Sequence, residues 1–210
     1  MIEQGTDEWL LQRCGKVTAS RIADLTARTR NGWGASRVNY MAELIAERLT
    51  GKPTEKYVNA AMEHGTKTEP EARNVYSFMW NVTVDQVGFI EHPTIAMSGA
   101  SPDGCVGDKG LIEIKAPQIA KHLDTLLNET VDERYVKQMA WQMAVTGREY
   151  CDFVSYSPSL PVEMRLWVRR HDRDDKLISE LEEQVQEFLH ELDAKVKALR
   201  EKYEAKELAA

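Results

Sequence analysis

The sequence predicts a mixed α/β protein, of the α+β type, with a central mixed β-sheet flanked by helices and a long C-terminal helix. Helical patterns precede and follow a run of strand patterns between residues 82 and 168, an order typical of a sheet with helices on its faces. The longest periodic segment comes last, over about residues 172–206. A length of 210 residues favours a single domain, 1–210, with a sizeable core.

The first expected helix is short and amphipathic and covers residues 4–13. A tryptophan and two leucines stand there among polar residues, and Thr6 or Asp7 can serve as the N-cap.

The next segment carries two hydroxyl residues, Thr18 and Ser20, that can cap a following helix. Their hydroxyls, the free N–H groups of that helix and the nearby Arg13 would together form an anion site. Helix capping alone explains the two hydroxyls equally well.

A polar loop is expected over residues 28–35, with Trp33 between two glycines. We expect this tryptophan to pack onto the domain, with a contact to a partner or to DNA as the alternative. A helix over residues 38–49 follows and is closed by Gly51.

A second helical stretch runs over about residues 58–80. The pattern predicts an interruption at Gly65 and a restart at Glu69, because Pro70 suits the first turn of a helix. The helix dipole favours a carboxylate at such a start, so Glu69 has a purely structural explanation.

The centre of the sequence is a predicted hairpin that two strands, over residues 82–90 and 94–98, lead into. Successive side chains of a strand alternate between faces, so Glu113 and Lys115 share one face. Asp103 stands in turn chemistry between Pro and Gly, and the hairpin can return the chain so that Asp103 meets Glu113. Two carboxylates and one lysine therefore converge.

This grouping suits phosphodiester hydrolysis. Oxygens of Asp103 and Glu113, with the backbone carbonyl of Ile114, suit Mg²⁺, which also binds substrate phosphate and acidifies water. Beside a cation, Lys115 can have its pKa lowered enough to accept a proton from that water. The alternative is an ordinary hairpin whose Asp caps a turn and whose Glu and Lys face solvent.

Two further helices are expected after Pro117, one to about residue 127 and one over residues 131–145. In the second, Tyr135, Gln138 and Trp141 recur at a spacing of three and share a face. If this face turns toward the hairpin, the glutamine can orient a water or hold the lysine; a surface glutamine is the alternative.

The last helix is preceded by two paired strands, 151–156 and 162–168. Its apolar stripe is formed by Ile178, Leu181, Val185, Phe188, Leu192, Val196, Leu199 and Tyr203. We expect the stripe to pack on the sheet or on another subunit, because its register slips near Val196 and disfavours an independent coiled coil.

The composition limits the class of protein. The net charge of −7 argues against a nucleic-acid partner, but from Asp172 onward there are 12 acidic and 7 basic residues, so a near-neutral body can still carry a basic groove. Three separated cysteines indicate neither a disulfide framework nor a zinc site. No apolar run is long enough for a membrane span and no secretory signal is present, so we expect a cytoplasmic protein.

Several motifs occur together in one order: Glu3-Gln4-Gly5 with Trp9, Arg13-x-Gly15-x-Val17-Thr18-Ala19-Ser20, Gly65 with Glu69, Ser101-Pro102-Asp103-Gly104, Glu113-Ile114-Lys115 with Pro117, and Tyr135 with Gln138. In these motifs the sequence resembles the YqaJ-like viral recombinase family, which includes the bacteriophage lambda exonuclease and belongs to the restriction-endonuclease-like PD-(D/E)xK superfamily. The likeness extends from about residue 3 to the strand near Tyr156.

The resemblance implies a restriction-endonuclease-like core and a catalytic role for five residues. It implies Asp103 and Glu113 as metal ligands and Lys115 as the catalytic lysine. Gln138 matches the residue that supports the attacking water, and Glu69 matches an additional acid near the metals.

The resemblance also implies contacts to DNA. Arg13, Ser20 and Ser101 match the positions that grip a terminal 5′-phosphate. The sequence departs from the lambda pattern in its shorter N-terminus, in the loop 28–36 and at position 121, where the lambda protein has an arginine. The further DNA contacts to be considered are Thr18, Trp33, Lys121 and Tyr135.

The implied function is that of a Mg²⁺-dependent exonuclease, with Mn²⁺ as an expected substitute, acting on double-stranded DNA ends. It would hydrolyse the 5′-phosphorylated strand processively, from 5′ to 3′, to mononucleotides and leave 3′ overhangs. Family members are ring-shaped homotrimers that act with a single-strand annealing protein, which implies a phage or prophage protein in the cytoplasm of a bacterial host. The alternatives are a structure-specific endonuclease or RecB-like nuclease module of the same fold, and a non-catalytic DNA-end-binding subunit.

Overall fold

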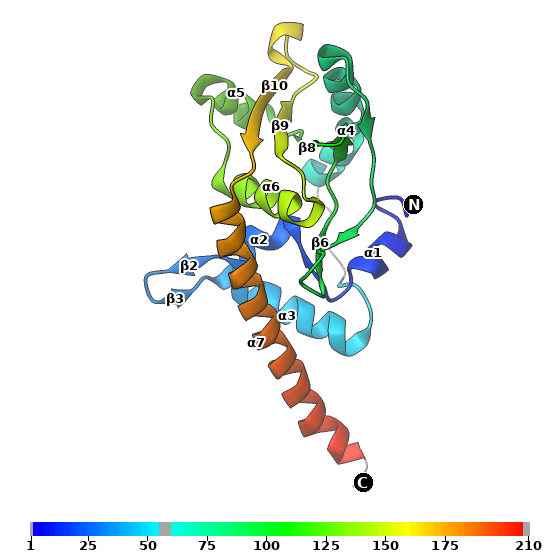
Figure 1. The fold of residues 1–210 in the computed structure, drawn as a ribbon, viewed down its shortest axis with the longest axis vertical. Helices are drawn as coiled ribbons and strands as arrows, with labels where there is room; N and C mark the ends of the chain where they lie inside the picture. The colour runs from blue at the N-terminus through cyan, green and yellow to red at the C-terminus, as the bar shows by residue number, and fades with distance from the viewer. Residues whose placement is uncertain (1, 55–59, 208–210) are drawn as a thin grey trace.

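The computed structural model describes residues 2–54 and 60–207 and is built around a five-stranded mixed sheet (Figure 1). The strands of this sheet are β4 (Val84–Asp85), β7 (Gly104–Val106), β8 (Gly110–Lys115), β9 (Tyr150–Tyr156) and β10 (Leu166–Asp172). Their order is β10-β9-β8-β7-β4; β8 and β9 run parallel and the other neighbours antiparallel. The predicted fold class is confirmed.

Short strands form two smaller sheets. A three-stranded sheet contains β1 (Val17–Thr18), β6 (Ser98–Ala100) and β5 (Ile90–Glu91), and a two-stranded hairpin pairs β2 (Arg28–Thr29) with β3 (Gly32–Trp33). The polar loop predicted for this last region is therefore wrong, because its residues pair as two strands. The resulting hairpin projects from the body (Figure 1). The strands predicted over 82–90 and 94–98 are shorter and shifted because a turn held by the imidazole of His92 separates β5 from β6.

The first helix confirms its prediction. Helix α1 spans Asp7–Arg13, and the hydroxyl of Thr6 accepts a hydrogen bond from the N–H of Trp9 at 3.3 Å. The next helical segment is only η1 (Ala19–Arg21) followed by α2 (Ile22–Leu25). Thr18 stands at the start of η1 without a side-chain capping bond, so its predicted capping role is wrong.

Helix α4 spans Ala60–Trp80 without a break, so the interruption predicted at Gly65 and the restart at Pro70 are wrong. A proline inside a helix removes one backbone hydrogen bond, but the buried face of α4 packs on the sheet and holds the helix together. Glu69 consequently lies inside the helix and not at its start. The predicted beginning at Val58 lies outside the described residues.

Three further helices confirm their predictions within a few residues. They are α3 (Ala35–Thr50), α5 (Ile119–Asn128) and α6 (Glu133–Thr146). Helix α3 ends at Gly51, whose φ of 67° is the left-handed conformation that glycine adopts readily. A short η2 (Val162–Met164) occupies the start of the second strand predicted before the last helix.

Helix α7 (Asp175–Glu207) is the longest element, as predicted. It packs against α2, α3 and α6, so the expectation that it lies on the sheet is wrong, because α6 already covers that face. Its stripe is buried from Ile178 to Val196. Leu199 and Tyr203 are exposed because the end of α7 extends beyond the body (Figure 1).

The two faces of the central sheet belong to different hydrophobic clusters. Leu111 of β8 lies in the cluster that contains α6 and α7, whereas Ile112 and Ile114 lie in the cluster that contains α4. Glu113 and Lys115 therefore face α6, as the alternation of a strand requires. The end of β8 is thus the place where α4, α6 and the sheet meet.

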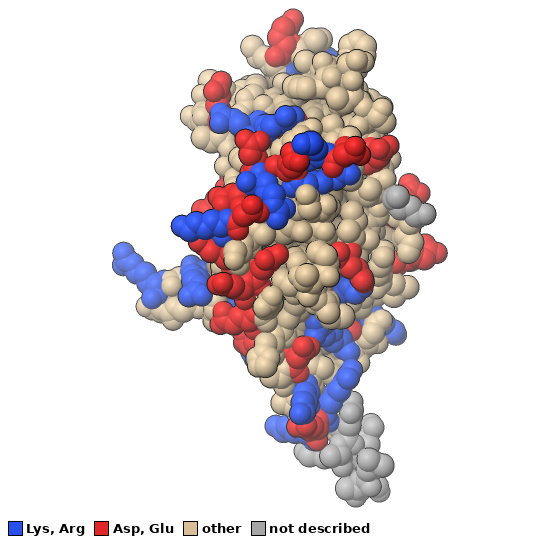
Figure 2. Space-filling model, viewed as in Figure 1, with Lys and Arg blue, Asp and Glu red and all other residues tan. Residues whose placement is uncertain are grey.

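The surface and the helices add two observations. Within residues 2–54 and 60–207, no helix is long and apolar enough to cross a membrane. Figure 2 shows Lys and Arg interspersed with Asp and Glu across the middle of one face of the molecule.

Candidate active site

Asp103, Glu113 and Lys115 come together at the β7–β8 hairpin. Asp103 immediately precedes β7, whose Gly104 is paired with Ile112, and its Oδ2 accepts a hydrogen bond from the N–H of Ile114 at 2.6 Å. The Nζ of Lys115 forms an ion pair with Oε1 of Glu113. The predicted convergence is confirmed, and the alternative in which Glu113 faces solvent is wrong because Glu113 is fully buried.

Helix α6 adds two amides to Glu113. Gln138 donates from Nε2 to Oε1 at 2.8 Å, so the alternative of a surface glutamine is wrong. Gln142 donates from Nε2 to Oε2 at 2.6 Å. Sequence reasoning missed Gln142, although its spacing of four from Gln138 places both residues on one helix face.

Helix α4 contributes an acid and a cation from the other side. Glu69 forms an ion pair with Arg73 one turn along the helix. The Nε of Arg73 also donates to the backbone carbonyl of Asp103 at 3.1 Å. Arg73 therefore ties α4 to the turn before β7; sequence reasoning missed it because nothing in the local pattern distinguishes it from a surface arginine.

The acids of this cluster disturb one another electrostatically. Burial and the charge of Glu113 raise the pKa of Asp103 well above its usual value, and burial raises the pKa of Glu69, with Glu113 adding to it. Burial lowers the pKa of Lys115, but Glu113 and Asp103 outweigh it and leave that pKa raised. In the protein alone, the two carboxylates stabilise the ammonium form of Lys115. The lowered pKa expected for this lysine beside a bound cation stays a prediction.

The donor chemistry fits a divalent cation. Carboxylates of Asp103, Glu113 and Glu69 crowd negative charge that a hard cation would neutralise, and carboxylate and carbonyl oxygens are the ligands that Mg²⁺ prefers. In the described part of the chain, no group of three or more Asp, Glu, His or Cys side chains is placed to hold a metal ion.

Two members of the expected 5′-phosphate set are linked by a tryptophan. The guanidinium of Arg13 lies 3.8 Å from the ring centroid of Trp9, and the indole N–H donates to Oγ of Ser101 at 3.0 Å. The Nε of Arg13 is buried and makes no hydrogen bond to a described residue. Ser20 is exposed on η1, and no hydrogen bond within the described ranges joins it to the other two.

A glutamine positions the turn beside this set. The Nε2 of Gln4 donates to the carbonyls of Val87 and Pro102 at 2.7 and 2.9 Å. The N-terminal segment is thereby attached to the same turn that carries Ser101 and Asp103, so the two expected sites are neighbours.

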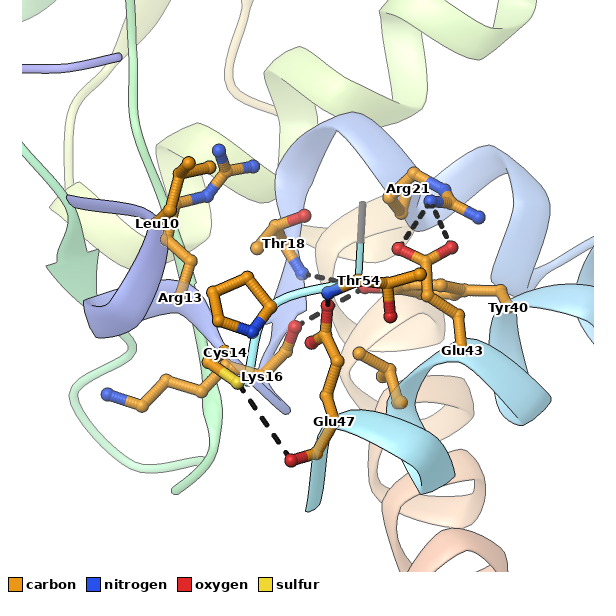
Figure 3. Close-up of a pocket in the computed structure, with 12 residues that line it drawn as sticks. Leu10, Arg13, Cys14, Lys16, Thr18, Arg21, Tyr40, Glu43, Glu47 and Thr54 are labelled. Atoms are coloured by element: carbon orange, nitrogen blue, oxygen red, sulfur yellow. Dashed lines mark hydrogen bonds and ion pairs between the residues drawn. The ribbon is translucent and has the colours of Figure 1, made fainter. Parts of the chain in front are cut away.

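A small pocket of about 30 Å³ lies between α1 and α3 (Figure 3). Arg13 stands on one side of it, and the ion pair of Arg21 with Glu43 on the other. Below them, the carboxylate of Glu47 accepts from the N–H groups of Gly15 and Thr54 at 2.6 and 2.9 Å. Glu47 thereby fixes the chain that follows Arg13.

The expected DNA-contact residues differ in accessibility. Thr18 lines the pocket but is 6% exposed. Lys121 is exposed and paired with Asp124 at 3.1 Å. The ring of Tyr135 stacks on Phe153, and its centroid lies 5.0 Å from Nζ of Lys115. The ring of Trp33 is contacted by two guanidinium groups, that of Arg28 at 4.1 Å and that of Arg37 at 3.8 Å from the ring centroid. The packing role preferred for Trp33 is confirmed.

The fold and the cluster of acids around a lysine define a nuclease of the restriction-endonuclease-like class. The sequence profile of the YqaJ-like viral recombinase domain matches residues 8–149. The chain belongs to the YqaJ-like viral recombinase family.

One curated relative is an uncharacterised protein of Acanthamoeba polyphaga mimivirus, 27% identical over 165 residues. The match covers 72% of this chain and 29% of that protein, so the chain spans less than a third of the length of the curated relative it matches.

Solved structures are more similar. An alkaline exonuclease from Laribacter hongkongensis is 51% identical with a TM-score of 0.89, over 97% of this chain and all of that one, and the same exonuclease in complex with dAMP gives the same values. A phage-related exonuclease from Haemophilus somnus is 16% identical with a TM-score of 0.72, over 88% of this chain and 96% of that one, and shows the fold alone. The predicted enzyme class, a deoxyribonuclease of the exonuclease type, is confirmed by the family and by the first of these structures.

Proposed function

We propose that the protein is a Mg²⁺-dependent exonuclease that acts on double-stranded DNA ends. It degrades the 5′-phosphorylated strand processively, from 5′ to 3′, to mononucleotides, and leaves 3′ single strands for annealing-type recombination. The observation that carries this proposal is the convergence of Asp103, Glu113 and Lys115 beside the linked pair Arg13 and Ser101. The dAMP bound to the Laribacter exonuclease supports a nucleoside monophosphate as the product class.

The residues at the hairpin divide the reaction between them. Asp103 and Glu113, with the carbonyl of Ile114, would hold the divalent ion, which would polarise the phosphate and lower the pKa of a water. Lys115 holds a proton beside the carboxylates and balances their charge. Gln138 lies against Glu113 and orients the attacking water, and Glu69 adds negative charge from α4.

The end of the DNA is recognised next to this cluster. Arg13 offers a guanidinium whose Nε has no hydrogen-bond partner among the described residues, and Ser101 and Ser20 offer hydroxyls. Charge-assisted hydrogen bonds contribute roughly 1.5–3 kcal/mol each, so a terminal 5′-phosphate is preferred over a 5′-hydroxyl. Thr18, Trp33, Lys121 and Tyr135 are proposed as further DNA contacts.

The proposal extends to the assembly. The active form is a homotrimeric ring that encloses DNA and works with a single-strand annealing protein, in a bacterial cytoplasm and under phage or prophage control. A ring retains an acidic protein on DNA because enclosure does not require a positive net charge. Mn²⁺ substitutes for Mg²⁺.

Digestion of linear duplex DNA, labelled separately at each strand's ends, tests the proposal. With Mg²⁺ we expect nucleotides to be released from phosphorylated 5′ ends, long 3′ strands to remain, and EDTA or a 5′-hydroxyl to suppress release.

Other outcomes contradict parts of it. Cutting of circular duplex DNA would replace the exonuclease by a structure-specific endonuclease. Equal digestion of phosphorylated and hydroxyl ends would remove the role proposed for Arg13, Ser20 and Ser101, and no cleavage at all would leave a DNA-end-binding subunit.

A further inference from the structure

The carboxylate of Glu113 has a separate amide donor on each oxygen. Oε1 accepts from Lys115 and from Gln138, and Oε2 accepts from Gln142. A carboxylate offers about four lone-pair directions, so three are occupied and the one that remains is on Oε2. The residue that orients Oε2 therefore decides where this free lone pair points.

The surroundings of Gln142 suit it to orient Oε2 of Glu113. Its side chain is fully buried, as is that of Glu113, so it contacts neither solvent nor DNA. Its backbone is held as well, because its carbonyl accepts from the hydroxyl of Thr146 at 2.7 Å. A buried amide with a single acidic neighbour at 2.6 Å has one orientation that avoids repulsion.

Cys151 on β9 fixes which end of that amide faces the acid. Its Sγ lies 3.9 Å from Oε1 of Gln142, within reach of a weak thiol hydrogen bond. The thiol is fully buried, and burial raises the pKa of Cys151 well above its usual value, so it keeps its proton and donates. The oxygen of the amide is thereby turned toward β9 and the NH₂ group toward Glu113.

We propose that Gln142 is a positioning residue for the metal ligand Glu113, with Cys151 fixing the orientation of its amide. The inference rests on the proposed function, because it assigns Glu113 to a divalent ion. Partners of this kind hold a ligand in its binding orientation, and their loss typically costs 10- to 100-fold in metal affinity. The role differs from that of Gln138, which is half-buried and shares its oxygen of Glu113 with Lys115.

The test substitutes Gln142→Met, which keeps the length of the side chain and removes the donor. Mn²⁺ is titrated into the full chain, and free Mn²⁺ is followed by electron paramagnetic resonance. We expect roughly 10- to 100-fold weaker Mn²⁺ binding and a lower kcat. KM for DNA ends, and duplex binding in EDTA, should match the wild type.

A matched control separates positioning from general damage. Gln184→Met alters a half-buried glutamine on α7 whose Nε2 donates to the backbone carbonyl of Glu180 in the same helix, and it should change neither Mn²⁺ binding nor kcat. In the second pair, Cys151→Ala should weaken Mn²⁺ binding, and Cys151→Ser, which keeps a donor on β9, should weaken it less. Thermal unfolding in EDTA shows whether Gln142→Met is folded. If it is not, the two Cys151 variants test the positioning role in its place.

The failures are distinguishable. Wild-type Mn²⁺ affinity in folded Gln142→Met, or in Cys151→Ala, would overturn the positioning role while the wild-type enzyme continues to cleave DNA. Absence of both Mn²⁺ binding and cleavage in the wild type would overturn the proposed function itself.

Discussion

Glu113 depends on one side chain of its own strand, Lys115, and on two glutamines of α6. A buried carboxylate needs such partners because an unpaired charge in the interior is very costly. Each partner removed should therefore have a different effect. Lys115 balances the negative charge of Glu113, and the two amides hold its carboxylate in one orientation.

Lys115→Ala should lower hydrolysis by roughly 10²- to 10⁴-fold, because it removes the group that holds a proton beside the reacting phosphate. Duplex binding in EDTA should remain close to that of the wild type. Strand-labelled digestion and a filter-binding assay check both. Lys137→Ala is the control, because Lys137 on α6 has a similar side-chain exposure, 26% against 28%, and also pairs with a glutamate. Turnover retained by Lys115→Ala would remove its catalytic role.

Arg73→Met should destabilise the protein by roughly 1–3 kcal/mol, because the carboxylate of Glu69 and the carbonyl of Asp103 lose a buried donor. It should also lower kcat, since the turn that carries Asp103 is no longer tied to α4. Denaturant unfolding and single-turnover cleavage measure the two effects. Lys67→Met, at an exposed position on the same helix, should leave stability and kcat unchanged. Equal behaviour of the two variants would contradict the role of Arg73 in tying α4 to the turn before β7.

At the scale of elements, α7 is part of the core and not an appendage. Its stripe lies against α2, α3 and α6, and Phe188 stacks on Tyr40 of α3 at 5.6 Å between ring centroids. Burial is the dominant favourable term in folding, so the buried and the projecting parts of this helix should respond differently to truncation.

Phe188→Ala should cost about 3–5 kcal/mol in the free energy of unfolding, as expected when a buried aromatic leaves a cavity. Leu199→Ala, in the projecting part of the same helix, should cost roughly 0.5 kcal/mol or less. Urea unfolding of both variants compares them. Similar losses at the two positions would mean that a partner covers the projecting part in solution.

His92 connects the turn after β5 to α6 and α7. Its ring stacks on Trp141 at 5.0 Å and lies 3.2 Å from Glu182, and its Nδ1 accepts from the N–H of Ile95. Burial lowers the pKa of His92 below its usual value of 6.5, although Glu182 opposes this. The unfolded state therefore binds a proton first on acidification, so stability falls as the pH drops below about 6.5.

His92→Asn should flatten this dependence between pH 7 and pH 5, because the amide oxygen can replace Nδ1 as an acceptor but does not titrate. Stability at pH 7 should fall because the stack on Trp141 is lost. Thermal unfolding as a function of pH measures both, with the exposed His64→Asn as control. An unchanged acid slope in His92→Asn would assign the acid sensitivity to other groups.

At the scale of the whole molecule, the charge distribution raises the question of how the protein stays bound to DNA. The chain carries seven excess negative charges, and cations and acids alternate across one face (Figure 2). An open acidic monomer should lose DNA readily at physiological salt. Enclosure by a ring removes that difficulty.

Light scattering of the purified protein without DNA should therefore give three times the mass of the chain. Addition of excess unlabelled DNA after the reaction starts should barely shorten the tracts already being digested. A monomer, or digestion that stops at once when the competitor is added, would contradict the ring.

The sequence by itself determined most of the helices, the central hairpin and the grouping of its charged side chains. Strand alternation placed Glu113 and Lys115 on one face, turn residues brought Asp103 to them, and the motif order indicated the family. These are local properties, because the periodicity of side chains and the conformations of Pro and Gly act over a few residues.

Only the tertiary structure decided which surfaces meet. Gln142 and Arg73 touch the site because α6 and α4 pack on opposite faces of the sheet end, and no local pattern encodes that contact. Helix α4 continues through Pro70, and α7 lies on helices and not on the sheet, since packing energy outweighs local preference. The raised pKa of Lys115 has the same origin: it depends on charges brought together from distant parts of the chain.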